Sequence, residues 1–157
     1  MSELTVRPYR PGDLDEVVAV WRESKRAAYP YVAAQQSYTA AQDTAYFRDI
    51  VAIECSVWLA DHGGAVVGLL ALNQDFIDQL FVAPQHQRTG VGSSLLARAK
   101  EHSPQRLRLR TFARNTAARA FWERHGFRVV GYGVSAPPEN EPDIVYEWRA
   151  RTPSPGP

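Results

Sequence analysis

The sequence predicts a single α/β (α+β) domain in which a mixed, twisted sheet of about seven strands carries helices on both faces. The length of 157 residues fits one domain with an ordinary core, and a composition of 45% hydrophobic and 11% aromatic residues is typical of globular proteins. Short segments with period-two alternation are interleaved with segments whose apolar residues share one helical face. We see no repeat or linker, so we expect one domain.

The expected elements follow from periodicity and from turn residues. The segment His62-Gly63-Gly64 is a hairpin signal between two strands, and proline or glycine bounds several others. We expect strands at residues 4–9, 56–61, 65–72, 76–82, 106–112, 128–132 and 144–148. We expect helices from 14 to about 26, from 37 or 39 to about 53, from 90 to about 102, and from 115 to about 125.

The formal net charge of +1 conceals an uneven distribution. Residues 1–87 contain 6 Lys/Arg and 11 Asp/Glu, a net charge of −5, whereas residues 88–157 contain 12 and 6, a net charge of +6. A basic half suits an anionic ligand, either a phosphorylated cofactor or a nucleic acid. Arg106, Arg108 and Arg110 share one strand face without interleaved aromatic residues, so a solvated or carboxylate-paired face is the commoner outcome.

The stretch from Val82 to Leu96 has the sequence of an anion-binding turn. A hydrophobic strand enters a proline turn, a polar loop follows, and Gly90 and Gly92 open an amphipathic helix. The first turn of a helix has backbone N–H groups without partners and a partial positive charge, which suit phosphate. A P-loop lysine and the third glycine of a dinucleotide fingerprint are both missing. We expect the two glycines to face the ligand.

Two motifs carry a resemblance to a known family. Gln87-Arg88-Thr89-Gly90-Val91-Gly92 is similar to the Q/R-x-x-G-x-G/A signature of the GNAT superfamily, the acyl-CoA-dependent N-acetyltransferases. The segment from Asn115 to Phe127 resembles the family's late helix, in which an Asn opens the helix and an aromatic pair precedes a terminal Gly-Phe. The resemblance extends to about Trp148. It implies an acetyltransferase domain over residues 1–149, and residues 150–157 are expected to be a disordered tail.

The resemblance implies acetyl-CoA as the cofactor. In the family, backbone amides of the glycine turn hold the pyrophosphate, the preceding strand pairs with the pantetheine amides, and the late helix meets the cofactor arm. Carried onto this sequence, the cofactor-binding residues are Leu80, Phe81, Val82, Gln87, Arg88, Thr89, Gly90, Val91, Gly92, Ser93, Asn115 and Trp122.

The implied reaction transfers the acetyl group to a primary amine of a small molecule, a peptide or a protein. A deprotonated amine attacks the thioester directly in a ternary complex, so no covalent enzyme intermediate is needed. One departure matters: Trp122 stands where the family often has the Tyr that protonates the leaving thiolate, and an indole N–H cannot transfer a proton at neutral pH. The reaction then runs without an acid, because a thiolate is a tolerable leaving group, or it uses Tyr132.

Asp78 is the candidate for the general base. With period two, Asp78 shares a strand face with Phe76, Leu80 and Val82 and interrupts an otherwise apolar face. A carboxylate there would be desolvated and would be a better base than a free Asp, taking the proton of the acceptor ammonium through water. The alternative is a structural pairing of Asp78 with an arginine of the neighbouring strand.

The connection between the first two helices lies, in the family, over the acceptor side of the active site. Tyr29, Tyr31 and Tyr38 are therefore candidates for the substrate-binding wall, although aromatic residues between helices are more often packing. The acceptor stays open at this point: a small amine, an antibiotic, a polyamine or a protein N-terminus.

The remaining chemistry-bearing residues indicate no site. The 4 histidines have no second ligand at metal-binding spacing, so no metal is expected, and Cys55 is expected in the core. The single cysteine and the absence of an apolar leader suggest a cytoplasmic protein, and without a long apolar run no membrane partner is expected. Nucleic acid is disfavoured as a partner, and the protein is expected to be a monomer or a homodimer. The alternative function is a non-catalytic acyl-CoA-binding sensor, which would keep the glycine turn and lack the acid.

Overall fold

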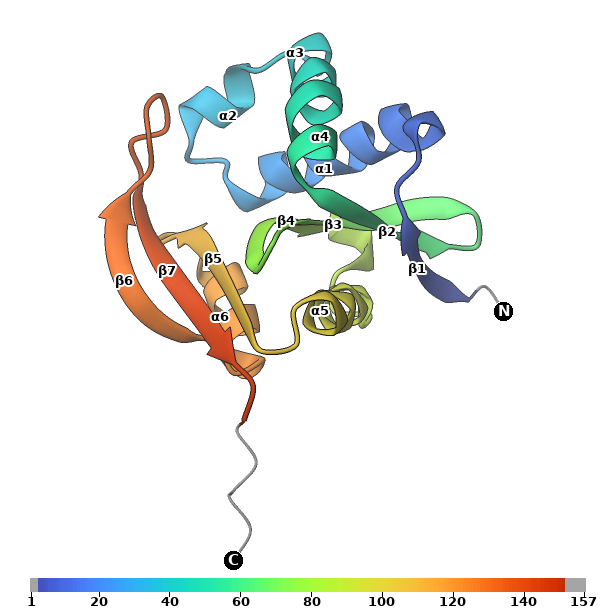
Figure 1. Cartoon of the computed structure of the whole chain (residues 1–157). Coiled ribbons are helices and arrows are strands. Elements are labelled where there is room, and N and C mark those ends of the chain that lie inside the picture. Colours follow the sequence, from blue (N-terminus) through green and yellow to red (C-terminus); the bar gives the residue numbers. More distant parts are fainter. Residues whose placement is uncertain (1–2, 152–157) are drawn as a thin grey trace, which may run out of the picture.

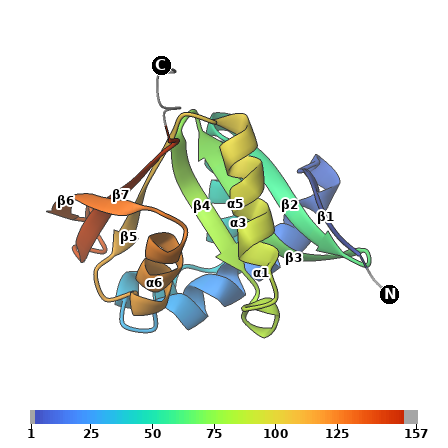
Figure 2. The same ribbon diagram turned by 90° about the horizontal axis from the view of Figure 1, so that it is seen from below.

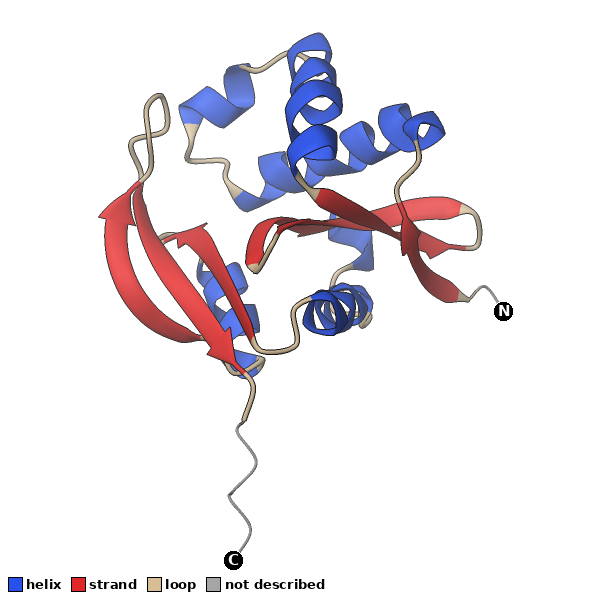
Figure 3. Cartoon of the chain, in the orientation of Figure 1, coloured by secondary structure: helices blue, strands red, loops and turns tan. Residues whose placement is uncertain are grey.

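The computed structural model describes residues 3–151, which form a seven-stranded sheet with helices on both faces (Figures 1 and 3). The strands are β1 (Leu4–Pro8), β2 (Ser56–His62), β3 (Ala65–Asn73), β4 (Phe76–Val82), β5 (Arg106–Phe112), β6 (Arg128–Val134) and β7 (Pro142–Arg149). Their order is β1-β2-β3-β4-β5-β7-β6. β4 and β5 run parallel and the other neighbouring strands run antiparallel, so the predicted mixed α/β sheet is confirmed.

Two groups of helices cover the two faces of the sheet (Figure 2). The α-helices are α1 (Leu14–Ala28), α2 (Ala33–Ser37), α3 (Ala40–Tyr46), α4 (Ala52–Glu54), α5 (Val91–His102) and α6 (Thr116–Arg124). α1 and α3 lie over one face, where Val17 and Phe47 are fully buried, and α5 and α6 lie over the other, where Leu95 and Leu107 are fully buried. The sheet therefore separates two hydrophobic cores.

The connection after α1 differs from its prediction. The sequence predicts one helix from residue 37 or 39, but the structure has a separate helix, α2, before it. Thr39 begins the longer segment, because Thr39 Oγ1 accepts from the Gln42 N–H at 3.1 Å and Gln42 Oε1 accepts from the Thr39 N–H at 2.8 Å, which is a capping box. α3 then continues through a π-helical stretch, Phe47–Val51, into α4. α2 has only 5 residues, too few for apolar periodicity to reveal it.

β4 and β5 pair only where they begin. Their ladder consists of Phe76 opposite Arg108 and Ile77 opposite Leu109. Beyond Ile77 the ladder stops, while β4 stays bonded to β3 along its other edge as far as Val82. The sheet therefore opens at its centre, between two strands that are neighbours at one end only (Figure 1).

A β-bulge at Asp78 changes which side chains share a face of β4. The pairing with β3 passes from Ile77 to Gln79 and leaves Asp78 as an extra residue. Strict alternation would put Ile77 and Leu80 on opposite faces, yet both belong to the core beneath α5. The prediction that Asp78 shares an apolar face with Leu80 and Val82 is therefore wrong, and Asp78 is exposed.

The three arginines on the outer face of β5 are paired with carboxylates, as the commoner of the two interpretations predicts. These ion pairs neutralise the positive charge that a nucleic acid would contact. None of the partners is Asp78, so its structural pairing with a neighbouring arginine is not formed within residues 3–151. The pairs are Arg106 with Asp75, Arg108 with Glu147 and Arg110 with Asp143, at N···O distances of 2.6, 2.7 and 3.5 Å.

The predicted disordered tail, residues 150–157, lies outside the described residues apart from Ala150 and Arg151. Within the described part of the chain, no helix is long enough and apolar enough to cross a bilayer.

Candidate active site

A cavity of about 1100 Å³ occupies the opening between β4 and β5. It extends from the N-terminus of α5, along the edges of the two strands, to α1, α2 and α3. Thr89, Val91 and Tyr132 are the predicted site residues that do not line it. The predicted residues that do are Tyr29, Tyr31, Tyr38, Asp78, Leu80, Phe81, Val82, Gln87, Arg88, Gly90, Gly92, Ser93, Asn115 and Trp122.

The end of the cavity beside α5 fits an anionic group. Gly90 is the N-cap of α5 and has a φ of 90°, a left-handed conformation that favours glycine. The next N–H groups, those of Val91, Gly92 and Ser93, lie in the first turn and have no intrahelical acceptor; the Ser94 N–H is the first to reach back, donating to the Gly90 C=O at 3.0 Å. These N–H groups and the positive end of the helix dipole can hold a pyrophosphate.

Side chains of the preceding loop fix its conformation. Gln87 Nε2 donates to the Val82 C=O at 3.2 Å, and Thr89 Oγ1 donates to the His86 C=O. Arg88 has a φ of 62°, which is uncommon for a residue with a Cβ. Thr89 therefore acts on the shape of the turn rather than on the cavity.

Gly92 also has a role in packing. A Cβ at Gly92 would lie 3.0 Å from Cε2 and 3.2 Å from Cζ of Phe121. The ring of Phe121 fills the space left by the absent side chain, while Gly92 still lines the cavity, so its contact with the ligand stays a prediction. The contact holds α5 and α6 together at the cavity.

The sequence does not predict that His125 contacts the first turn of α5. Its Nε2 lies 3.1 Å from Ser93 Oγ in the first turn of α5, and its ring centroid lies 4.4 Å from that of Phe121. Burial lowers the pKa of His125, and the charges of Lys100 and Arg124 lower it further. The residue lies 32 positions after Ser93, and no motif or periodicity links the two.

Tyr29 forms the wall of the cavity near the C-terminal ends of β4 and β5. Its ring packs edge-to-face on both strands, with centroid distances of 6.1 Å to Phe81 and 4.9 Å to Phe112. Burial raises the pKa of Tyr29, and Tyr31 adds to the effect. Tyr29 is therefore a neutral phenol that packs between the strands.

Asn115 and Trp122 support the cavity from α6. Asn115 is the N-cap, and its Oδ1 accepts from the Ala118 N–H at 3.2 Å. Trp122 is 6% exposed and packs against the rings of Phe121 and Phe127. Trp122 is thus a core residue that borders the cavity.

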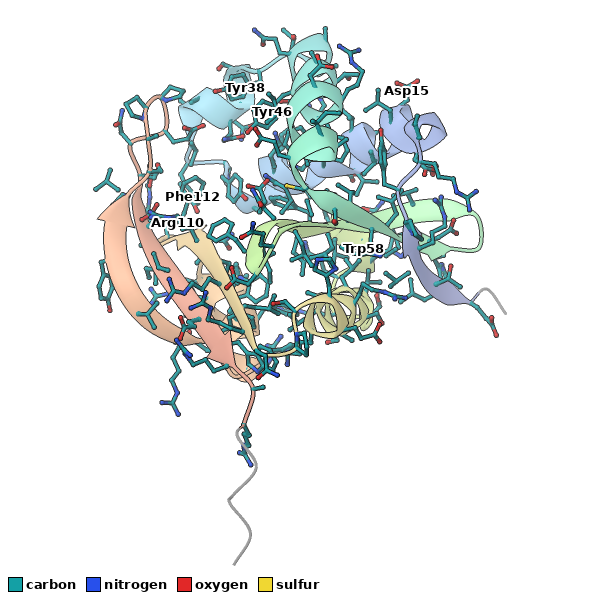
Figure 4. The ribbon with its side chains drawn as sticks, viewed as in Figure 1. Asp15, Tyr38, Tyr46, Trp58, Arg110 and Phe112 are labelled. Carbon is teal, nitrogen blue, oxygen red and sulfur yellow. The ribbon has the colours of Figure 1, made fainter. Side chains whose placement is uncertain are left out.

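The other half of the cavity, which we call the acceptor half, is lined from α1, α2 and α3. Tyr38 and Tyr46 lie on the α3 side of the sheet, across from Phe112 of β5 (Figure 4). The rings of Trp21 and Tyr46 stack with centroids 6.2 Å apart. The guanidinium carbon of Arg114 lies 4.3 Å from the ring centroid of Tyr31. An aromatic wall of this kind suits an alkyl chain that ends in a cation.

Two segments far apart in the sequence meet over the acceptor half. Gln35 Nε2 on α2 donates to Glu139 Oε1, in the loop before β7, at 2.9 Å across 104 positions. Both residues line the cavity. The Gln35 Oε1 atom is buried and has no hydrogen-bond partner among the described residues.

The two predicted catalytic residues have different outcomes. Asp78 lines the cavity and accepts a hydrogen bond from Gln79 Nε2 at 3.1 Å, but it is exposed rather than buried on an apolar face as predicted. Tyr132 is 79% exposed on β6, the edge strand two positions from β5, and lies outside the cavity. The structure therefore does not bring Tyr132 to the site, because strand order separates them.

The described residues contain neither a cluster of metal ligands nor a reactive thiol near the cavity. Among residues 3–151, no group of three or more His, Cys, Asp and Glu could hold a metal ion. Cys55 is partly buried against the core beneath α1, and burial raises the pKa of its thiol to about 11. Cys55 therefore stays a neutral thiol.

The fold and the cavity define a class of protein. The edge of β4 offers backbone groups to an extended ligand that contains amides, the start of α5 offers N–H groups to its phosphates, and the acceptor half leaves room for a second substrate. Acyl-coenzyme A has this sequence of groups. The chain belongs to the acetyltransferase (GNAT) family, whose model matches residues 16–127.

Named relatives agree with this assignment. The chain is 30% identical over 132 residues to the uncharacterized N-acetyltransferase YafP of Escherichia coli (strain K12), and the aligned residues cover 83% of this chain and 85% of YafP. It is 28% identical over 129 residues to the peptidyl-lysine N-acetyltransferase YjaB of the same strain, covering 82% of this chain and 84% of YjaB.

Solved structures share the fold. The solution structure of apo YjaB from Escherichia coli aligns with a TM-score of 0.79 at 23% identity, covering 92% of this chain and 97% of that one. The PaiA N-acetyltransferase of Thermoplasma acidophilum, in complex with coenzyme A, aligns with a TM-score of 0.70 at 17% identity, covering 94% and 99%. The chain is an acyl-CoA-dependent N-acetyltransferase that uses acetyl-CoA, as the sequence predicts.

Gly92→Val should abolish the binding of acetyl-CoA, because the added side chain displaces Phe121 and disturbs the first turn of α5. At about a hundred times its Kd, acetyl-CoA should stabilise the parent protein by ~2.7 kcal/mol, seen as a raised melting temperature, and should not stabilise the variant. Gly12→Val is the matched control, since a Cβ at Gly12 has no atom within 4 Å. A folded Gly92→Val protein that acetyl-CoA stabilises fully would contradict the cofactor assignment.

Proposed function

We propose that this N-acetyltransferase acetylates the ε-amine of lysine side chains in peptides or proteins. One observation carries the proposal: Asp78 and Glu139 line the cavity next to the acceptor half and form no ion pair with any cation of the described residues. A lysine amine has a pKa of about 10.4 and arrives as an ammonium ion at neutral pH. Two uncompensated carboxylates favour the entry of such a cation.

The aromatic wall supports the same acceptor. The rings of Tyr38 and Tyr46 offer apolar surface to the four methylene groups of a lysine stem, and a ring face also attracts the ammonium group. The relative YjaB, named a peptidyl-lysine N-acetyltransferase, acts on this class of acceptor.

Cofactor binding is assigned to three parts of the chain. The N–H groups that follow Gly90 and the side chain of Arg88 would hold the phosphates, and the free edge of β4 from Leu80 to Val82 would pair with the pantetheine amides. Bound acetyl-CoA supplies a thioester whose carbonyl carbon is open to attack by an amine. What the protein adds is mainly alignment of the two reactants.

Asp78 is proposed to receive the proton of the acceptor ammonium through water. The bulge turns Asp78 out of the sheet core into the cavity, where it lies beside the acceptor half. Because Asp78 is exposed, the proton can pass on from it to solvent. Trp122 has no part in proton transfer, and departure of the thiolate needs no acid of its own.

The site is proposed to work in the cytoplasm, where a protein with one unpaired cysteine stays reduced and protein lysines are accessible. The oligomeric state, monomer or homodimer, stays a prediction. The sensor alternative differs in one respect: it binds acetyl-CoA without turnover on any amine.

The acceptor proposal predicts acetylated lysine peptides. The protein, incubated with acetyl-CoA and a panel of lysine-containing peptides, small amines and peptides with arginine in place of lysine, should add acetyl groups to the ε-amines, as detected by mass spectrometry. The arginine peptides are the matched control. Exclusive acetylation of small amines or of N-terminal amines would overturn the proposed acceptor, and binding of acetyl-CoA without any product would support the sensor.

Asp78→Asn keeps the shape of the side chain and removes its basicity. We expect the maximal rate to fall roughly ten- to a thousandfold, with the acidic limb of the pH profile shifted and acetyl-CoA affinity unchanged. Asp15→Asn makes the same change at an exposed position outside the cavity and should keep the parent rate (Figure 4). If Asp78→Asn keeps its rate and pH profile, the ammonium loses its proton directly to water.

Trp122→Phe retains the aromatic packing and removes only the indole N–H and part of the ring. Turnover in the folded variant should fall less than about tenfold, whereas loss of a true general acid costs about a hundredfold or more. Trp58→Phe, at a half-buried position on β2 outside the cavity, separates the effect of packing from the effect on catalysis. A hundredfold loss confined to Trp122→Phe would assign Trp122 a role in proton transfer or cofactor geometry.

A further inference from the structure

A buried lysine lies inside the acceptor half. Lys25 on α1 is 7% exposed and lines the cavity. Its Nζ lies 3.4 Å from the ring centroid of Trp21 and 3.5 Å from Asp43 Oδ1. Buried lysines are rare and are normally held by a close carboxylate, so the environment of this amine decides its state.

The carboxylate beside Lys25 is shared unequally. Arg22 Nη1 donates to Asp43 Oδ2 at 2.7 Å, a much closer contact than the 3.5 Å between Lys25 Nζ and Asp43 Oδ1. Asp43 therefore neutralises mainly Arg22, and Lys25 keeps a long, weak ion pair. Burial lowers the pKa of Lys25 and the charge of Arg22 lowers it further, while Asp43 acts in the opposite direction. A larger share of Lys25 than of a solvated lysine is the neutral, nucleophilic amine.

The wall of the cavity connects Lys25 with the region of the proposed base. Trp21, whose ring faces the amine, donates from Nε1 to Gln79 Oε1 at 3.1 Å, and Gln79 Nε2 donates to Asp78 at 3.1 Å. These residues lie on the same cavity as Leu80 and the free edge of β4. Lys25 is thus an amine built into the space that an acceptor amine must enter.

One other lysine side chain competes with Lys25 for an acetyl group. The sequence contains two lysines, Lys25 and Lys100. Lys100 lies on α5 outside the cavity, with its Nζ 4.6 Å from the ring centroid of Trp148. Arginine guanidinium groups stay protonated at neutral pH and do not act as acceptors.

We propose that Lys25 is an intramolecular acceptor, so that the enzyme acetylates itself at this residue when it holds acetyl-CoA without an external amine. The inference rests on the proposed function only in placing the reactive thioester and the acceptor amine in one cavity. The product is a protein with one modified side chain inside its own acceptor half.

The reaction balances with the groups at hand. Neutral Lys25 Nζ attacks the thioester carbonyl carbon, a C–N bond forms, the C–S bond breaks and coenzyme A leaves as the thiolate. The proton lost from Nζ passes to Asp43 and then to the thiolate or to water. The resulting amide is uncharged, so Asp43 keeps Arg22 alone, and the added acetyl group occupies space that an acceptor side chain needs. Self-acetylation therefore limits turnover when acceptor is scarce.

The experiment uses the whole chain with acetyl-CoA and no acceptor, followed by intact mass measurement and peptide mapping. Lys25 should gain one acetyl group roughly tenfold or more faster than Lys100, since only Lys25 shares a cavity with the thioester. Lys100→Arg should leave this labelling unchanged, whereas Lys25→Arg, which keeps the positive charge beside Asp43, should remove it. Excess desulfo-coenzyme A should slow labelling of Lys25 and not of Lys100. Mapping of the parent protein decides the matter even if Lys25→Arg folds poorly.

A lysine peptide acetylated in a parallel reaction separates this inference from the function it rests on. An acetylated peptide with an unmodified Lys25 would overturn the inference and leave the proposed function standing. Equal labelling of both lysines, or labelling of Lys25 that desulfo-coenzyme A does not slow, would assign the modification to solution chemistry and overturn it as well. If neither the peptide nor Lys25 is acetylated, both the inference and the proposed acceptor fail.

Discussion

The active site depends on the absence of hydrogen-bond pairing between β4 and β5 beyond Ile77. β4 and β5 share only the pairs at Phe76 and Ile77, and the remaining backbone groups on that edge of β4 must bond to water or to a ligand. An extended molecule with amide groups can take the place of the missing strand. Packing holds the gap open: α5 and α6 lie beneath it, and the ring of Tyr29 contacts both strands at its far end. The same two strands therefore supply the stability of the sheet and the room for substrates.

One extra residue in β4 sets the chemistry of that gap. Without the bulge, Asp78 would follow the strict alternation of the strand and enter the core with Leu80. With it, Ile77 and Leu80 both pack beneath α5, and Asp78 turns to the cavity next to Gln79. A bulge costs local ladder hydrogen bonds and re-aims a side chain, a common arrangement beside active sites. The carboxylate is therefore available to the acceptor because the strand is irregular at that point.

The features that the sequence predicts well are those set by neighbouring residues. Strand alternation, the hairpin at His62 and the helix that opens at Gly90 follow from short-range physics, and the Asn115 cap follows from the resemblance to the family. The features it misses depend on contacts between distant segments. The bulge is a matter of register with β3, the meeting of Gly92 with Phe121 requires two helices in place, and His125 reaches Ser93 only once the sheet has brought α6 beside α5. Tyr132 lies outside the site because β7 separates its strand, β6, from β5 in the sheet. The order of the strands along the chain does not reveal this order in space.

The hydrogen bond between Gln35 and Glu139 fastens α2 to the loop before β7 with a neutral donor. A charged donor forms a stronger bond to a carboxylate, so an arriving ammonium group would replace the Gln35 amide and release the fastening as it enters. Once acetylated, the same nitrogen has lost its charge and with it that advantage. A carboxylate held by a neutral amide would thus bind a charged acceptor more strongly than its neutral acetylated product.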